Sequence, residues 1–277
     1  MLGKLLKQEF RATGRIMLPV FGALVILSVL GNFSMRMLDS GMSNNGILGF
    51  LAVFFIGVFI FGMVAAVIMT LVLMISRFYR NLLKDEGYLM HTLPVSVHGL
   101  VWSKLIVSLV WFIVTGLVIF VIIFLTAIIQ SGTNLAEIFR EFPSWAEVKE
   151  MLAAYGIHGH DITLFFAELI ALSLVGMLAS CLHFYAAMAI GHMFSKDKVL
   201  LSIVFFVAIS FVLSLLASLL GFRVNDLAAL TVEENNAQAI LAFTRKLLLF
   251  SLGAELMQGA LLYFATTLSL RRGLNLA

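Results

Sequence analysis

Charged side chains are scarce in this chain of 277 residues. Asp, Glu, Lys and Arg make up 12% of it, whereas soluble proteins average roughly 25%. Apolar residues make up 62%, among them 25 Phe. This balance is far from that of a soluble protein and predicts a polytopic membrane protein. The net charge of +3 is best explained by membrane orientation, so we expect contact with the lipid bilayer and none with nucleic acid.

Cysteine is nearly absent, and the motifs of several enzyme classes are missing altogether. Cys181 is alone, which excludes an intrachain disulfide and a cysteine-based metal cluster. The sequence has no phosphate-binding GxxxxGKS or GxxxxGKT loop, no HExxH zinc motif and no GxSxG nucleophile elbow. We therefore expect no catalytic residue and no bound cofactor, and any ATP that drives this protein would be hydrolysed by another chain.

His158, His160 and Asp161 are close enough in sequence to suggest a metal site. The two histidines of an HxH pair point to opposite faces of a strand, however. The pattern therefore favours a solvated loop, and no metal is predicted.

Six apolar runs are long enough to cross a bilayer core of about 30 Å, for which a helix needs about 20 residues. They lie near 16–35, 47–75, 101–129, 162–191, 199–221 and 247–270. The sequence thus predicts an all-α integral membrane protein, one domain over residues 1–277 with its six helices within 16–270. The second run would be about 43 Å long, so it must tilt or project beyond the headgroups.

Residues 1–15 have the pattern of an amphipathic helix lying in the membrane plane. Its apolar face holds Leu2, Leu5, Leu6 and Phe10, and its polar face holds Lys4, Lys7, Gln8, Arg11 and Arg15. The apolar run that follows lacks a clear small-x-small cleavage site. We therefore expect a retained first span, not a removed signal peptide.

The distribution of basic residues predicts the orientation. With the N-terminus inside, the inner segments hold 12 of the 18 Lys and Arg. This bias places both termini and residues 76–104 in the cytoplasm, and residues 130–161 outside.

Two segments outside the main runs also have recognisable patterns. Ser144 and Glu147 have the spacing of a capping box, which predicts a short helix over 144–154. In the predicted outer loop at 222–246, the apolar stretch within 235–245 has the composition of a re-entrant helix.

The polar interruption at 76–104 begins with a predicted amphipathic helix. Phe78, Tyr79, Leu82 and Leu83 share one face, and Arg77, Arg80, Asn81, Lys84 and Asp85 share the other. Gly87 and then Leu93-Pro94 indicate where the helix stops and the chain turns back. From the pattern alone, a helix that simply lies on the headgroups is an equally good interpretation.

Three ionisable residues fall inside apolar runs, where charge is costly and usually faces the protein interior or a polar path. For Glu255, polar packing or pathway lining competes with a protonated acid that only forms hydrogen bonds. For Glu168, the alternative to a pathway is a side chain reaching the outer interface. His183 fits a helix-packing contact better than a proton relay. Small residues at four-residue spacing indicate close helix approach, at Gly62/Ala66, Gly176/Ser180, Ala187/Gly191 and Ser210/Ser214/Ser218.

The stretch RFYRNLLKDEGYLMHTLPVS (77–96), followed by Ser103-Lys104, resembles the loop between spans two and three of type-2 ATP-binding-cassette (ABC) exporter permeases, especially small permeases of Gram-positive bacteria. KLLKQEFR (4–11) and LRRGLNL (270–276) are similar to that family too. The loop between spans three and four, at 32 residues, is longer than a minimal member needs.

The resemblance implies a permease subunit of an exporter in a bacterial cytoplasmic membrane. The apolar spans favour a hydrophobic or amphipathic substrate, and nothing in the sequence excludes an ion. The resemblance also implies a dimer with a second copy or a related permease, each paired with an ABC ATPase subunit that binds ATP. Residues 76–100 would form the cytoplasmic coupling loop, and residues 1–15 a connecting helix. The implied ATPase-coupling residues are Arg77, Phe78, Arg80, Leu83, Lys84, Asp85, Glu86 and Tyr88.

A different class of protein fits the same pattern. A non-transporting immunity or anchoring protein would use this loop to hold a cytoplasmic partner. An intramembrane enzyme is less favoured, because no nucleophile, base and orienting residue share a credible spacing.

Overall fold

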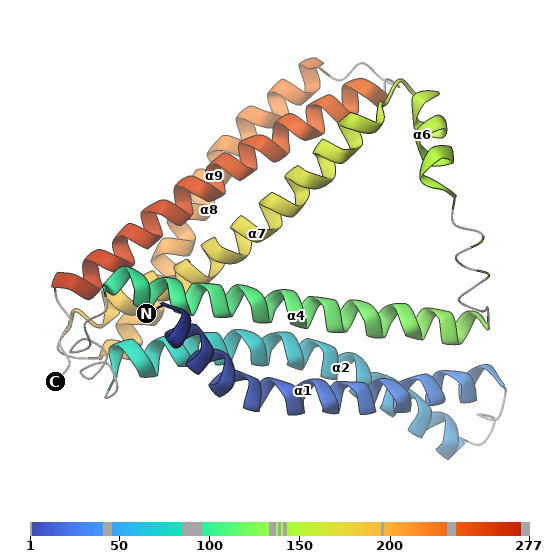
Figure 1. The fold of residues 1–277 in the computed structure, drawn as a ribbon, viewed down its shortest axis with the longest axis horizontal. Coiled ribbons are helices and arrows are strands. Elements are labelled where there is room, and N and C mark those ends of the chain that lie inside the picture. The colour runs from blue at the N-terminus through green and yellow to red at the C-terminus, as the bar shows by residue number, and fades with distance from the viewer. Residues whose placement is uncertain are drawn as a thin grey trace. The chain divides into compact units, whose positions relative to one another are not determined.

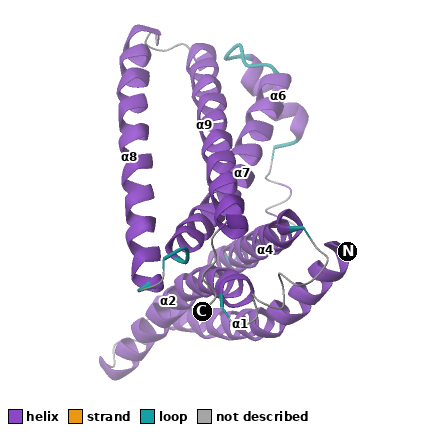
Figure 2. Cartoon of the chain, turned by 90° about the vertical axis from the view of Figure 1, so that its left-hand side faces the viewer, coloured by secondary structure: helices purple, strands orange, loops and turns teal. Residues whose placement is uncertain are grey.

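The structure is a computed structural model that describes residues 2–40, 46–84, 96–132, 137, 140, 143–194, 197–231 and 237–272. Every regular element in these residues is a helix (Figure 2). The long helices, in chain order, are α1 (Leu2–Asp39), α2 (Gly46–Phe78), α4 (Val97–Ser131), α7 (Gly159–Gly191), α8 (Lys198–Thr231) and α9 (Ala237–Arg272). The shorter elements are a π-helix, η2 (Tyr79–Leu83), directly after α2, and α6 (Trp145–Ala153) before α7.

Each of the six long helices is long and apolar enough to cross a membrane. The described chain is therefore an all-α, multi-pass membrane protein, as predicted, and all six predicted runs fall within these helices. The helices extend beyond the runs because hydropathy marks only the part that lipid surrounds. The 33 residues of α2 would extend about 50 Å, well beyond a bilayer core of about 30 Å.

The amphipathic segment predicted at 1–15 is helical from Leu2, but it continues into the first span within α1. Pro19 lies inside this helix. A proline there lacks an N–H and its ring crowds the carbonyl four residues earlier, that of Arg15, which bends the helix. Figure 1 shows the first turns of α1 running at an angle to the rest. The predicted boundary after residue 15 is therefore a bend and not a break.

The helices divide into two compact units. The first comprises Met1–Arg77 and Trp102–Phe142, and the second comprises Phe78–Val101 and Pro143–Ala277. Two clusters of buried side chains from α1, α2 and α4 form the core of the first unit: Met17, Leu73, Met74, Val107 and Trp111 in one, and Leu24, Phe59, Ala66 and Ile122 in the other.

Small residues bring α1 and α2 close together in the first unit. A Cβ atom added at Gly62 would lie 2.7 Å from Leu27 Cδ1, and one added at Gly31 would lie 2.8 Å from the ring of Phe59. Ala66 follows Gly62 by about one turn and is also buried. The predicted Gly62/Ala66 pair therefore lies in a helix interface, as small residues do in membrane bundles.

In the second unit, α7 packs against both α8 and α9 (Figure 1). The end of α7 meets the start of α8 at Gly191, where an added Cβ would lie 2.3 Å from Ser202 Oγ and 2.6 Å from Ser202 N. Ala187 is buried one turn earlier. Gly176 differs from Gly191, because no atom outside the adjoining backbone of α7 lies within 4 Å of a Cβ placed there.

The region predicted as an outer loop at 222–246 is mostly helical. α8 continues to Thr231, and α9 begins at Ala237. Residues 237–245 are thus the first turns of the last long helix, and the re-entrant interpretation is wrong for them. α6 is confirmed with its cap, because Ser144 Oγ accepts the Glu147 N–H at 3.3 Å and Glu147 Oε2 accepts the Ser144 N–H at 3.0 Å.

Candidate functional site

The segment that leaves α2 remains helical and turns its apolar side inward. Phe78 and Leu82 are fully buried and Leu83 is nearly so, whereas Arg80 and Lys84 are exposed. These five residues follow the predicted amphipathic pattern.

Two members of the predicted polar face differ from that pattern. Arg77 is half-buried, and Asn81 is buried at 4% exposure. For Asn81 the reason lies in the π-helical geometry of η2, whose i→i+5 turns are wider than those of an α-helix and shift the faces. Asn81 is thereby turned inward with Leu82 and Leu83. Asp85, Glu86 and Tyr88, also named as coupling residues, lie outside the described residues.

The buried side of this segment packs on the end of α7. The ring of Phe78 stacks on that of Tyr185, with centroids 3.9 Å apart and an interplanar angle of 8°. Tyr79 lies edge-on to His192, with centroids 5.2 Å apart. Two aromatic contacts therefore join Phe78 and Tyr79 to the end of α7 within the second unit.

His192 follows α7 directly and is only 2% exposed. Its Nδ1–H donates to the Met188 carbonyl at 2.9 Å. Burial lowers the pKa of His192 below its ordinary value, and the nearby charge of Lys198 lowers it further, while the hydrogen bond to Met188 opposes the shift. The imidazole therefore resists protonation, in keeping with its place between Tyr79 and α7.

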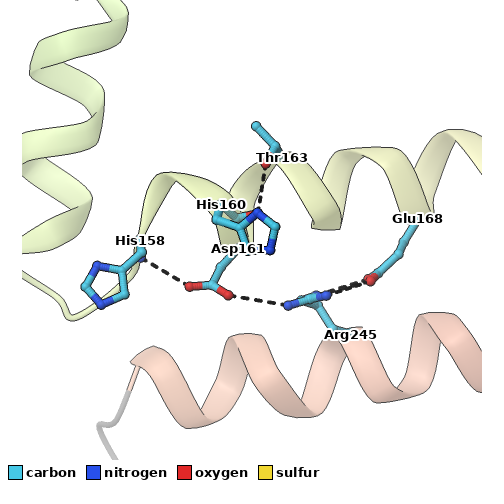
Figure 3. Close-up of polar contacts among 6 residues, drawn as sticks. All are labelled: His158, His160, Asp161, Thr163, Glu168 and Arg245. Atoms are coloured by element: carbon cyan, nitrogen blue, oxygen red, sulfur yellow. Dashed lines mark hydrogen bonds and ion pairs between the residues drawn. The ribbon is translucent and has the colours of Figure 1, made fainter.

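A charged cluster links α7 with α9 at the other end of α7 (Figure 3). The guanidinium of Arg245 lies between two carboxylates: Nη2 donates to Glu168 Oε1 at 2.8 Å, and Nη1 lies 3.5 Å from Asp161 Oδ1. The side chain of Glu168 is 12% exposed. Glu168 thus has an ion-pair partner, which makes a carboxylate in an apolar helix far less costly.

The residues before Glu168 form a helix start and not the predicted loop. α7 begins at Gly159, and Asp161 Oδ2 accepts the backbone N–H of His158 at 3.3 Å (Figure 3). His158 and His160 are exposed. Within the described part of the chain, no three His, Cys, Asp or Glu residues are arranged to hold a metal ion.

The other two predicted polar residues have different surroundings. His183 Nε2 lies 3.2 Å from Ser210 Oγ and 3.3 Å from the Phe206 carbonyl, and the His183 ring packs on that of Phe206, which is a packing contact between α7 and α8. Glu255 is half-buried in α9, and its carboxyl group forms no hydrogen bond or ion pair with the described residues.

Sequence reasoning missed a buried ion pair in the first unit. Lys104 Nζ donates to Glu9 Oε1, and both side chains are less than a tenth exposed. Nearby, Trp111 Nε1 donates to Thr13 Oγ1 at 2.8 Å, and this hydroxyl donates to the Glu9 carbonyl. The contacts fasten the start of α1 to α4. Glu9 is the one acidic residue among the apolar and basic residues of 1–15, and only this exception could have indicated that it has a basic partner.

A second missed contact joins α4 and α9 within the second unit. Arg271 Nη2 donates to His98 Nε2 at 2.7 Å. Because arginine can only donate, His98 carries its proton on Nδ1 and donates to Tyr263 Oη at 2.6 Å. His98 thereby ties the end of the last helix to the start of α4.

No family model, no curated protein and no solved structure matches this chain.

Proposed function

We propose that this protein is the membrane-spanning permease subunit of an ABC exporter in a bacterial cytoplasmic membrane. A separate ATPase subunit would bind and hydrolyse ATP, and a second permease copy or a related chain would complete the translocation path. Both termini and the segment after α2 would lie in the cytoplasm. The substrate would be hydrophobic or amphipathic, in keeping with the apolar helices.

The observation that carries the proposal is the two-sided character of the segment at 78–84. Its exposed side offers the cationic side chains Arg80 and Lys84 to a partner. Its buried side packs on α7 through the stacked rings of Phe78 and Tyr185. A segment that merely rested on lipid headgroups would turn its apolar side toward the membrane and not toward another helix.

This arrangement would allow a movement of the 78–84 segment to be passed to the long helices. η2 follows α2 without a break, so a displacement of Arg80 is passed to the second span. The Phe78–Tyr185 stack passes the same displacement to α7, because packed aromatic rings resist sliding. ATP-driven closure of the two ATPases would thus move helices that border the translocation path.

The test is a coupling experiment on the complex with its ATPase, isolated by co-purification in mild detergent. Replacing Arg80, Asp85 and Glu86 together by Ala should reduce substrate-stimulated ATP hydrolysis and ATP-dependent substrate movement in vesicles at least tenfold. Membrane insertion should remain normal. The control variant, Lys149→Ala/Glu150→Ala on α6, removes exposed charges from a different helix and should leave both activities unchanged.

Three results would contradict the proposal. Unchanged transport in the triple variant would rule out the coupling role of these residues. The absence of any co-purifying ATPase would contradict the whole proposal. A bound partner without ATP-dependent substrate movement would instead favour the anchoring protein.

A further inference from the structure

An apolar groove of about 570 Å³ lies between α1 and α4 in the first unit. Its walls are formed mostly by Val, Leu and Ile side chains, from residues 25–32 of α1 and 114–129 of α4. Both stretches belong to helices that can span a membrane. The groove therefore opens along a surface where acyl chains are the surrounding medium.

One end of this groove is polar. Asn32 lines it and donates from Nδ2 to the Ser28 carbonyl at 2.8 Å and to Thr126 Oγ1 at 3.0 Å. Gln130 Nε2 donates to both the carbonyl and Oδ1 of Asn32, at 3.2 Å each. Because both partners are acceptors, the amide nitrogen of Gln130 is fixed toward Asn32 and its oxygen must point elsewhere. That oxygen is buried and accepts no hydrogen bond within the described residues.

A positive charge lies at the same end. Arg36, one turn after Asn32, is exposed, and its Nη2 donates to the carbonyl of Ile129, a groove residue, at 2.8 Å. One such bond leaves most of the guanidinium donors available to an anion. The apolar run of the first span stops just before Arg36, and α1 ends at Asp39. Arg36 is therefore at the level where lipid headgroups lie.

We propose that this groove is a binding site for one anionic phospholipid of the surrounding bilayer. An acyl chain occupies the apolar part, and the phosphate pairs with Arg36. Charge complementarity selects an anionic over a zwitterionic lipid, because a zwitterionic headgroup carries no net charge for Arg36 to attract. This lipid site does not require that the protein be a transporter.

The first experiment maps the contact in the intact chain. The protein is placed in phosphatidylcholine nanodiscs that contain a photoreactive phosphatidylglycerol as a minor component. Crosslinks should concentrate in the peptides that contain 25–32 and 117–129. Unlabelled phosphatidylglycerol should displace the probe about fivefold better than phosphatidylcholine does, the factor expected for one basic residue near the membrane surface.

Matched variants separate the headgroup contact from the acyl contact. Arg36→Gln should abolish the preference for phosphatidylglycerol and leave the crosslinked peptides the same. Val121→Trp fills the groove and should reduce crosslinking severalfold, whereas Ile123→Trp, equally exposed on α4 but outside the groove, should not. Both positions are about half exposed, so each variant should fold, which size-exclusion chromatography verifies.

Four outcomes would overturn the proposal. Crosslinks spread over all the helices would show that no site exists. If unlabelled phosphatidylglycerol and phosphatidylcholine displaced the probe equally well from the unaltered protein, the site would not select the headgroup. Equal effects of Val121→Trp and Ile123→Trp would exclude the groove. Crosslinks from 117–129 to a second copy of the chain would assign this face to an interface between copies.

Discussion

Glu9 and Lys104 form an acid–base pair that is buried between α1 and α4. Removing one member leaves the other charge in an apolar surrounding, which costs more than removing both. We predict that Glu9→Gln lowers the free energy of unfolding by about 3 kcal/mol and that Glu9→Gln/Lys104→Met recovers most of this loss. Unfolding in mixed detergent micelles measures both.

A control for this pair is Glu150→Gln, which alters an exposed carboxylate on α6 and should change stability by less than about 0.5 kcal/mol. A double variant as unstable as Glu9→Gln would show that the pair's packing, and not its uncompensated charge, determines stability.

His192 makes the stability of the second unit depend on pH. Because burial lowers its pKa in the folded protein below the ordinary value of 6.5, the unfolded chain takes up a proton first as the pH falls. The stabilising contribution of neutral His192 is therefore complete above about pH 6.5 and is lost as the pH falls toward the lowered pKa.

We predict that the unfolding temperature of the unaltered protein falls more than that of His192→Gln between pH 8 and pH 5.5. Effects of the other titrating groups occur in both proteins and cancel in this comparison. Parallel thermal unfolding curves in the same detergent provide the measurement, and equal losses would show that folding does not lower the pKa of His192.

Among the helices, α7 and α8 make a close contact at Gly191 that a single substitution can test. A methyl group at Gly191 would overlap backbone atoms of Ser202, which cannot rotate away as a side chain does. Gly191→Ala should therefore destabilise the protein by about 1–3 kcal/mol.

Gly176→Ala is the matched control, because the site is on the same helix with open space around it. It should be neutral or stabilise by up to about 1 kcal/mol through higher helix propensity. Unfolding in micelles compares the two. If both variants behave alike, the close approach at Gly191 does not contribute to stability.

The helices show which features of the fold can be predicted from local sequence patterns. The six apolar runs were correctly located because burial in lipid requires a long apolar stretch, and α6 was located by its capping box. The ends of α1, α8 and α9 were misplaced, since the backbone can remain helical in water where hydropathy gives no signal.

The charged contacts between helices could not be predicted from local sequence patterns. Glu168 and Arg245 are separated by 77 positions, and Glu9 and Lys104 by 95. Pairing them requires knowing which helices are neighbours and which faces meet. In the structure, Glu168 and Arg245 each follow the start of a long helix by about two turns, but the sequence placed Arg245 before the last span, at 247–270, so this shared depth could not be predicted.

For the whole molecule, the orientation in the membrane decides whether a cytoplasmic ATPase can reach this chain. Lys84 lies after the second span and Tyr155 before the fourth, so one further crossing, α4, separates them and they should face opposite sides. Both are exposed, and the single native thiol, Cys181, is buried. The excess of basic residues predicts that Lys84 lies on the cytoplasmic side.

We predict that in a Cys181→Ser background, Lys84→Cys is labelled by a membrane-impermeant maleimide only after the cells are opened. Tyr155→Cys should be labelled in intact cells and is the matched control, because it verifies that the reagent reached the cell surface. The reverse pattern would place the exposed side of η2 outside the cell. ATP is hydrolysed in the cytoplasm, so that result would leave the segment without access to the proposed motor, and neither the Phe78–Tyr185 stack nor the charge of Arg80 could then serve the proposed coupling.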